Sequence, residues 1–251
     1  MFKIALFIFS FILSSLAYTQ NLHVFVALCD NENQGIVPVP SKLGNGKDPE
    51  HNLYWGAAYG VKSYFQYKTK DWEWVKTIKS ENPKILQRIL FKHTHKEAYL
   101  LADAYDGAFI QTCTKNFLLS ANGQSPEQIS YEGKDLTFGG GADLLAYIGH
   151  DGLMEFEVDL TYQPIDQPKD LIILACSSQT YFGSEVEQAN AHPLLWTTNL
   201  MAPEAYSLHA AIAGWLEQEN GELILERAAQ AYNTYQKCGI GGARSLFATG
   251  F

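Results

Sequence analysis

A cysteine and a histidine each follow directly on a short apolar segment of this chain. Cys176 comes after the run LIILA at 171–175, and His150 comes after the run LLAYIG at 144–149. A thiolate is a strong nucleophile, and a neighbouring imidazole can accept and return a proton near neutral pH. Together the two residue types could carry nucleophilic catalysis at a carbonyl carbon. Each also has a simpler interpretation, because a cysteine is often a small buried hydrophobe and a histidine at a strand end can be a turn residue.

Short apolar runs alternate along the chain with segments whose apolar residues recur at helical spacing. Such a pattern is typical of a mostly parallel sheet whose two faces are covered by helices. The sequence therefore predicts one α/β domain over residues 18–251, built as a three-layer α/β/α sandwich. Residues 68–97 are ambiguous, and the glycine-rich residues 239–242 predict a loose tail. The expected strands are 22–29, 98–104, 144–149, 171–175 and 194–198, and the expected helices are 54–67, 109–119, 203–218 and 222–237.

Polar residues stand just after three of the expected strands. Ligands of open parallel sheets bind beyond the carboxyl ends of the strands, so these positions suit a functional site. Asp30 follows the first strand, His150 the third and Cys176 the fourth. The chain between His150 and Cys176 is long enough for a crossover, although the sequence does not show that the two strands are neighbours. Residues 30–50 are rich in proline and glycine and predict a long loop, of the kind that often binds ligands.

Residues 1–17 have the layout of a secretory signal peptide. Lys3 supplies a positive charge, residues 4–13 are apolar apart from a serine, and small residues fit a cleavage site after Ala17. An uncleaved membrane anchor is the alternative, but the apolar run is shorter than the roughly 20 residues that a spanning helix needs. We therefore expect cleavage, a secreted or periplasmic protein, and no membrane span in the mature chain.

The composition fits a folded globular domain. Hydrophobic residues make up 47% of the 251 residues and charged residues 18%, whereas disorder needs low hydrophobicity and high charge density. The formal charge is −9, and no cluster of Lys and Arg offsets it, so we expect no nucleic-acid partner. Nothing in the sequence indicates an oligomeric state.

The order of the two strand-end motifs resembles that of the caspase-like cysteine peptidases, the group that includes caspases, metacaspases, legumain, clostripain and gingipains. In this family an apolar strand leads to His-Gly, and a later apolar strand leads to Ala-Cys. Here the two blocks read LLAYIGHDG and LIILACSS, and the resemblance extends over roughly residues 22–200. It implies a caspase-like version of the three-layer fold. It also implies a cysteine endopeptidase that acts on a peptide or protein substrate and needs no cofactor or metal.

The resemblance also implies a role for each residue of the site. Cys176 would attack the carbonyl carbon as a thiolate, and His150 would raise the thiolate fraction and later protonate the leaving group. The backbone N–H of Cys176, with that of Gly152 or Asp151, would bind the oxyanion. Asp30 would line the pocket for the substrate side chain and favour a basic residue there. Asp30 has a simpler interpretation too, because Asp-Asn after a strand is a common start of a turn.

One position departs from the family pattern, since Asp151 stands between His150 and Gly152 where the family has the two residues adjacent. Asp151 could orient His150 or cap the following turn. The insertion favours a second hypothesis, in which the chain is a catalytically inactive relative that binds a peptide or a partner protein. A third hypothesis is a cysteine-dependent amidase or acyltransferase that acts on non-protein amides.

Other motifs give weaker signals. The glycines at 139–141 precede an expected strand, whereas a dinucleotide fingerprint follows one, and the chain has no Gly-x-Ser-x-Gly elbow. His93 and His95 lack a nearby third ligand, so a solvated strand end explains them better than a metal site. Pro203 and Glu204 predict an ordinary helix start.

The cysteines leave their pairing open. Two disulfides are possible in an oxidising compartment, but a nucleophilic Cys176 must remain a free thiol. A disulfide between Cys29 and Cys176 would exclude the enzymatic hypothesis. The four cysteines are Cys29, Cys113, Cys176 and Cys238.

Overall fold

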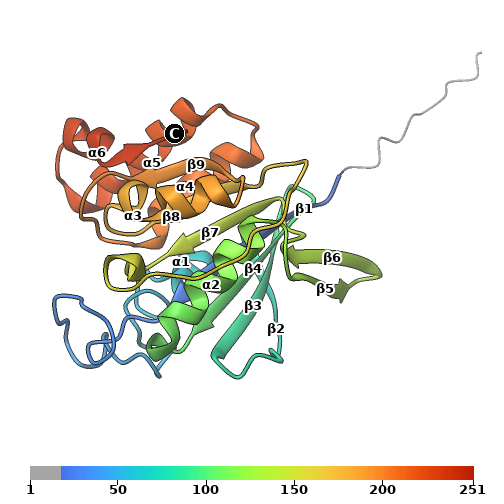
Figure 1. The fold of residues 1–251 in the computed structure, drawn as a ribbon, viewed down its shortest axis with the longest axis horizontal. Coiled ribbons are helices and arrows are strands. Elements are labelled where there is room, and N and C mark those ends of the chain that lie inside the picture. Colours follow the sequence, from blue (N-terminus) through green and yellow to red (C-terminus); the bar gives the residue numbers. More distant parts are fainter. Residues whose placement is uncertain (1–17) are drawn as a thin grey trace, which may run out of the picture.

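A large mixed sheet runs through the middle of the molecule (Figure 1). The structure, a computed structural model, describes residues 18–251, so the predicted signal peptide at 1–17 lies outside the described residues. The eight strands lie in the order β10-β9-β8-β7-β1-β4-β3-β2. Their bounds are β1 Gln20–Ala27, β2 Trp72–Thr77, β3 Ile85–His93, β4 Ala98–Tyr105, β7 Leu144–Ile148, β8 Asp170–Leu174, β9 His192–Thr197 and β10 Phe247–Ala248.

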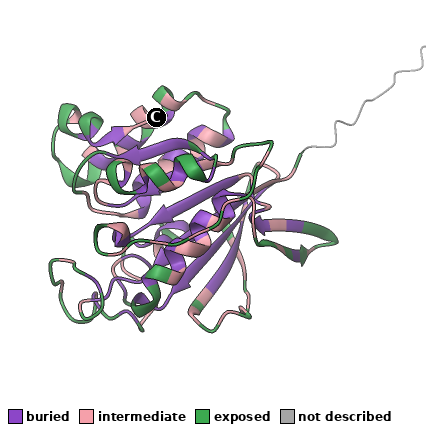
Figure 2. Ribbon diagram, viewed as in Figure 1, coloured by how far each residue is buried: buried purple, intermediate pink, exposed green. Residues whose placement is uncertain are grey.

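The centre of the sheet is parallel and its two edges are antiparallel. Strands β4, β1, β7, β8 and β9 pair in parallel, whereas β10 and the β2–β3 hairpin run against their neighbours. The central strands are buried along almost their whole length, which is why their sequences are continuous apolar runs (Figure 2). Side chains alternate between the faces: Val24 and Val26 of β1 belong to one core, and Phe25 and Ala27 to the other.

Helices cover both faces, as predicted, so the domain is a three-layer α/β/α sandwich. One core packs α1, α4, α5 and α6 against the sheet, and the other packs α2 and α3, of which α2 lies in front of the sheet in Figure 1. Within residues 18–251 no helix combines the length and apolar character needed to cross a membrane. The helices are α1 Val61–Tyr67, α2 Ile110–Ala121, α3 Ser178–Gln188, α4 Ala205–Leu216, α5 Gly221–Gln236 and α6 Ile240–Leu246.

The observed elements differ from the predicted ones in several places. The helix predicted for 54–67 begins only at Val61, because turns built around Gly56 and Gly60 bring these glycines against backbone that a side chain would meet. The prediction of a loose tail at 239–242 was wrong, since Gly239 is the N-cap of α6, which begins at Ile240 and contacts α5. The ambiguous residues 68–97 contain the whole β2–β3 hairpin and lead into β4.

A two-stranded ribbon covers the part of the sheet that α2 leaves open. Its strands are β5 Pro126–Tyr131 and β6 Lys134–Gly139, and in Figure 1 it projects beside β1 and β3. Ile129, Leu136 and Phe138 of the ribbon pack on Tyr99 and Leu101 of β4 in a small third core. A two-stranded ribbon is only marginally stable by itself in water, so this contact must hold it.

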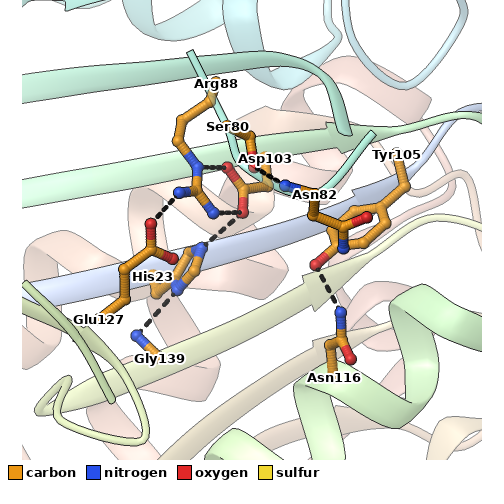
Figure 3. Close-up of polar contacts among 9 residues, drawn as sticks. All are labelled: His23, Ser80, Asn82, Arg88, Asp103, Tyr105, Asn116, Glu127 and Gly139. Carbon is orange, nitrogen blue, oxygen red and sulfur yellow. Dashed lines mark hydrogen bonds and ion pairs between the residues drawn. The ribbon is translucent and has the colours of Figure 1, made fainter. Parts of the chain in front are cut away.

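A buried polar network fastens the ribbon to the sheet (Figure 3). Arg88 of β3 grips the carboxylate of Asp103 on β4 with two bonds, Nε–Oδ1 at 2.6 Å and Nη2–Oδ2 at 2.7 Å, and its Nη1 donates to Glu127 of β5. His23 Nε2 lies 3.1 Å from Asp103 Oδ2, and His23 Nδ1 accepts a hydrogen bond from Gly139 N at 3.0 Å. A backbone N–H can only donate, so the His23 proton belongs on Nε2, where it is donated to Asp103. Thus both strands of the ribbon are tied to groups of the sheet.

Arg88 and Asp103 form a charge pair that is almost completely removed from water, with side chains 5% and 0% exposed. Burial by itself would raise the pKa of Asp103, but the hydrogen bonds and positive charge of Arg88, together with His23, outweigh it and hold that pKa below its usual value. The pair is therefore ionised in the folded protein, and each charge depends on the other for compensation.

Replacing Arg88 by methionine is expected to lower the free energy of unfolding by about 3–5 kcal/mol, because the Asp103 carboxylate would remain buried without its cation. Lys92→Met is the matched control on the same strand: Lys92 pairs with Glu132 at an exposed position, where solvent screens the pair and its loss has little effect on stability. Urea denaturation at pH 7 measures both. Equal losses for the two variants would contradict the role given to Arg88.

Candidate active site

Cys176 and His150 line the same pocket at the carboxyl ends of the parallel strands. The pocket has a volume of about 440 Å³. The last residues that pair between β7 and β8 are Ile148 and Leu174, so His150 and Cys176 each stand two residues beyond the sheet on adjacent strands. The walls come from residues 35–37 and 53–54 of the loop between β1 and α1, 149, 150 and 154 after β7, 176 after β8, 200–204 after β9, and Gln236 at the end of α5.

Polar side chains hold the loop between β1 and α1 in shape. Asn52 Oδ1 accepts from Cys29 N at 2.9 Å and its Nδ2 donates to Cys29 O at 2.8 Å, which ties the loop back to the end of β1. Asn31 makes a similar pair of bonds with the backbone of Val39. The long loop predicted at 30–50 is thus ordered, and it delivers apolar side chains to the pocket.

A tight turn positions Cys176 between β8 and α3. Ser177 adopts a left-handed conformation with φ 49°, which is unusual for a residue other than glycine, and its N–H donates to Asn199 O at 2.9 Å. Ser178 Oγ donates to Ile173 O at 2.8 Å and accepts from Thr197 N at 2.9 Å, while Thr197 Oγ1 donates to Ala175 O. These bonds fix the turn on both sides of Cys176.

The Cys176 thiol contacts the backbone of the segment after β9. Met201 N donates to Sγ at 3.5 Å, and Sγ lies 3.7 Å from Met201 O. Within the described chain, no hydrogen bond joins Sγ to His150. Burial raises the pKa of the Cys176 thiol, and the negative charge of Asp151 adds to the rise, while the hydrogen bond from Met201 opposes it. The thiol on its own is therefore protonated at neutral pH and needs a base to become a nucleophile.

His150 is held by a carboxylate that the sequence analysis did not consider. Its carbonyl accepts from Tyr147 Oη at 2.8 Å, and its Nε2 pairs with Glu155 Oε1, which also accepts from Gly35 N at 2.6 Å. An ionised Glu155 only accepts, so the His150 proton belongs on Nε2. In the neutral ring, the other nitrogen, Nδ1, therefore has the lone pair, and it makes no hydrogen bond within the described residues. A neutral His150 held in this way can accept a proton on Nδ1.

Gly152 and Asp151 do not line the pocket, unlike the residues before them. Asp151 caps a short 3₁₀ turn, Gly152–Met154, by accepting from Leu153 N at 3.0 Å, which is the capping alternative considered for it. The turn directs Gly152 into the second core, where an added side chain would meet the ring of Phe156 and Ile110. That Gly152 or Asp151 donates to an oxyanion stays a prediction, although neither residue lines the pocket. The N–H of Cys176 donates to no group in residues 18–251 and remains a candidate for that role.

Asp30 lies in a different hollow from Cys176 and His150. Its carboxylate is buried and closes its own loop, because Oδ1 accepts from Glu32 N at 2.9 Å and Oδ2 accepts from Asn33 Nδ2 at 2.8 Å. Asp30 therefore stabilises a turn, as the simpler interpretation expected. It does not line the pocket of Cys176, where the sequence predicted a substrate-binding role for it.

The sequence did not predict a place in the site for two glutamates, Glu155 and Glu204. Glu155 is only five residues from His150, and the Asp-Gly turn between them is the signal that could have shown that the chain doubles back. Glu204 is the N-cap residue of α4, which begins at Ala205 and not at Pro203 as predicted, and it also lines the pocket. Its Oε2 accepts from Tyr206 Oη at 2.9 Å and from Gln236 Nε2 at 3.0 Å.

The four cysteines are all free thiols, so no disulfide blocks Cys176. Among residues 18–251, His, Cys, Asp and Glu side chains do not form a group of three that could hold a metal ion. His93 is buried, and its Nδ1 accepts from the backbone N–H of His95 at 3.1 Å and of Lys96 at 3.0 Å, so it serves a turn.

A comparison of the chain with protein-family models, curated proteins and solved structures found no match.

The Asp151→Asn substitution is expected to change the pH dependence of stability. Burial raises the pKa of Asp151 to about 7, and its Oδ2 has no hydrogen-bond partner within the described chain. The folded protein therefore binds a proton that the unfolded chain releases near pH 4. The contribution of Asp151 to the free energy of unfolding therefore falls as the pH rises from about 4 to about 7, by up to about 4 kcal/mol.

Asparagine keeps the cap to Leu153 but cannot ionise. The stability of Asp151→Asn relative to the wild type should therefore increase with pH across this window, as measured by urea denaturation at pH 5 and pH 8. Parallel curves for the two proteins would show that Asp151 is not protonated in the fold.

Proposed function

We propose that the chain is an exported, caspase-like cysteine peptidase in which Cys176 is the nucleophile and His150 the acid and base. The observation that supports this proposal best is the common pocket: Cys176 and His150 stand two residues beyond the paired ends of adjacent parallel strands and line one cavity. Parallel sheets bind their ligands at this edge. The order of the two motifs along the chain matches the family pattern.

The proposed reaction uses the tautomer of His150 deduced from its partners. Nδ1 accepts the thiol proton, and the thiolate attacks the carbonyl carbon of the scissile amide to form a C–S bond. The imidazolium then protonates the leaving nitrogen as the C–N bond breaks, which leaves a thioester on Cys176. A water molecule, deprotonated by His150, hydrolyses the thioester and restores the thiol. The N–H of Met201 would stabilise the thiolate, and the N–H of Cys176 would stabilise the oxyanion.

Glu155 would act as a positioning residue. By accepting a hydrogen bond from the Nε2–H of His150, it fixes the tautomer in which the neutral ring has its lone pair on Nδ1, and it stabilises the imidazolium that forms in the reaction. Gly35 N–H anchors the same carboxylate oxygen from the loop. A side chain at position 35 would overlap the carboxylate of Glu155, so the glycine is required for this contact.

A catalytically inactive, peptide-binding relative is the second candidate function. Two observations favour it: Gly152 lies in the core instead of at the pocket, and the Cys176 thiol hydrogen bonds to Met201 and not to His150. Both candidates use the same pocket, and thiol reactivity separates them.

If Cys176 is activated, iodoacetamide is expected to alkylate it at pH 7 at least tenfold faster than Cys238, the exposed cysteine, and His150→Ala is expected to abolish the difference. The reason is that the thiolate reacts and the buried thiol needs His150 to lose its proton. Mass spectrometry of the native protein quantifies each site. Cys29 and Cys113 are buried and serve as internal controls. Alkylation of Cys176 no faster than that of Cys238 would contradict the enzymatic proposal and favour the binding candidate.

Glu155→Gln is expected to lower the rate of Cys176 alkylation at pH 7 by about tenfold to a hundredfold, since the amide no longer stabilises an imidazolium. It should also move the pH profile of alkylation to higher pH. A residue with a purely structural role would lower the rate without moving the profile. Glu32→Gln is the matched control, because Glu32 lines the other hollow and not the pocket of Cys176.

A further inference from the structure

We propose that the pocket beside Cys176 receives a large apolar side chain of a peptide substrate, and that the protein therefore cleaves after residues such as Leu or Met and not after basic residues. This inference rests on the proposed function, because it names the substrate class of the same site. Three observations carry it: the character of the walls, the exposure of the rim and the state of the nearby carboxylates.

The walls of the pocket are apolar on several sides. Besides Cys176 and His150, polar side chains are contributed by Tyr54, Glu204 and Gln236. Since binding sites of this size derive most of their affinity from apolar contact, an apolar group gains the most by entering. The apolar side chains that matter here come from two separate loops: Ile36, Val37 and Leu53 from one, and Leu200, Met201 and Pro203 from the other.

The rim of the pocket exposes large apolar side chains to water. Val37 is 87% exposed, Leu200 68% and Met154 40%, and all three line the pocket. Exposed apolar side chains that gather at one place, instead of being scattered singly, mark a binding surface. The three side chains come from different segments but line one pocket with Cys176, so a peptide bound there would cover them together. The rim of the pocket therefore favours apolar ligands, as its interior does.

The carboxylates near the pocket all accept hydrogen bonds. Glu204 accepts from Tyr206 and Gln236, Glu155 accepts from His150 and Gly35, and Asp30 closes its own loop in another hollow. Of the three, Glu204 alone lines the pocket, so a Lys or Arg side chain there would lose its water against mostly apolar walls and have this one carboxylate as counter-charge. The preference for a basic residue that depended on Asp30 has no support in this pocket.

The test uses the chain without the predicted signal peptide, residues 18–251. The substrates are a panel of fluorogenic peptides that differ only in the residue before the scissile bond. We expect kcat/KM for Leu and Met to exceed that for Ala, Arg and Asp by at least tenfold, since even a methylene in an apolar pocket is worth roughly tenfold. Leu200→Arg, at the exposed rim, should reduce cleavage after Leu by about tenfold. Leu86→Arg, an exposed leucine outside the pocket, is the matched control and should leave it unchanged.

Fastest cleavage after Arg, lost in Glu204→Gln, would overturn the apolar preference while leaving the peptidase proposal intact. Binding of the same peptides to Cys176→Ala, measured by fluorescence anisotropy, tests the pocket without requiring turnover. Tighter binding of the Leu peptide than of the Arg peptide supports the inference even if no peptide is cleaved, and only the proposed function then fails. Equal binding, or tighter binding of the Arg peptide, overturns the inference.

Discussion

The parallel pairing of β7 with β8 is the constraint on which the site depends. Backbone hydrogen bonds set this register from Leu144 with Asp170 to Ile148 with Leu174, and the apolar side chains of both strands lock it between the two helical layers. A shift by one residue would turn every one of those side chains to the opposite face. The same register brings the first polar residues beyond the sheet, His150 and Cys176, to one edge. Their proximity is therefore a by-product of burying the core.

Burial of Cys176 opposes formation of its thiolate. An apolar pocket suits an apolar ligand, but it disfavours a thiolate, and the raised pKa of Cys176 is the consequence. The structure opposes this effect with directed groups: the N–H of Met201 at the sulfur and the Glu155 carboxylate behind His150. The Glu155 carboxylate is itself anchored by Gly35 N–H, so it needs little reorganisation when charge develops. Whether Cys176 reacts or the pocket only binds a ligand depends on the balance between the desolvation of the thiolate and these contacts.

Much of the fold could be predicted because the central strands are buried on both faces and read as continuous apolar runs. The positions of His150 and Cys176 followed from the same runs, since strand ends are visible where polarity returns. The ribbon of β5 and β6 and helix α3 were not identified, because they are amphipathic or partly exposed and their patterns are weak. Site details failed for a different reason. Whether Asp30 or Glu155 meets the pocket depends on the path of loops, which side-chain hydrogen bonds determine and periodicity does not record.

One carboxylate oxygen connects the pocket wall to the imidazole. Gly35 N–H, from the loop that supplies a wall of the pocket, and His150 Nε2 both contact Glu155 Oε1. If the proposed function holds, a ligand that displaced this loop would also displace the carboxylate behind His150, and ligand binding and the reactivity of His150 would then be thermodynamically coupled.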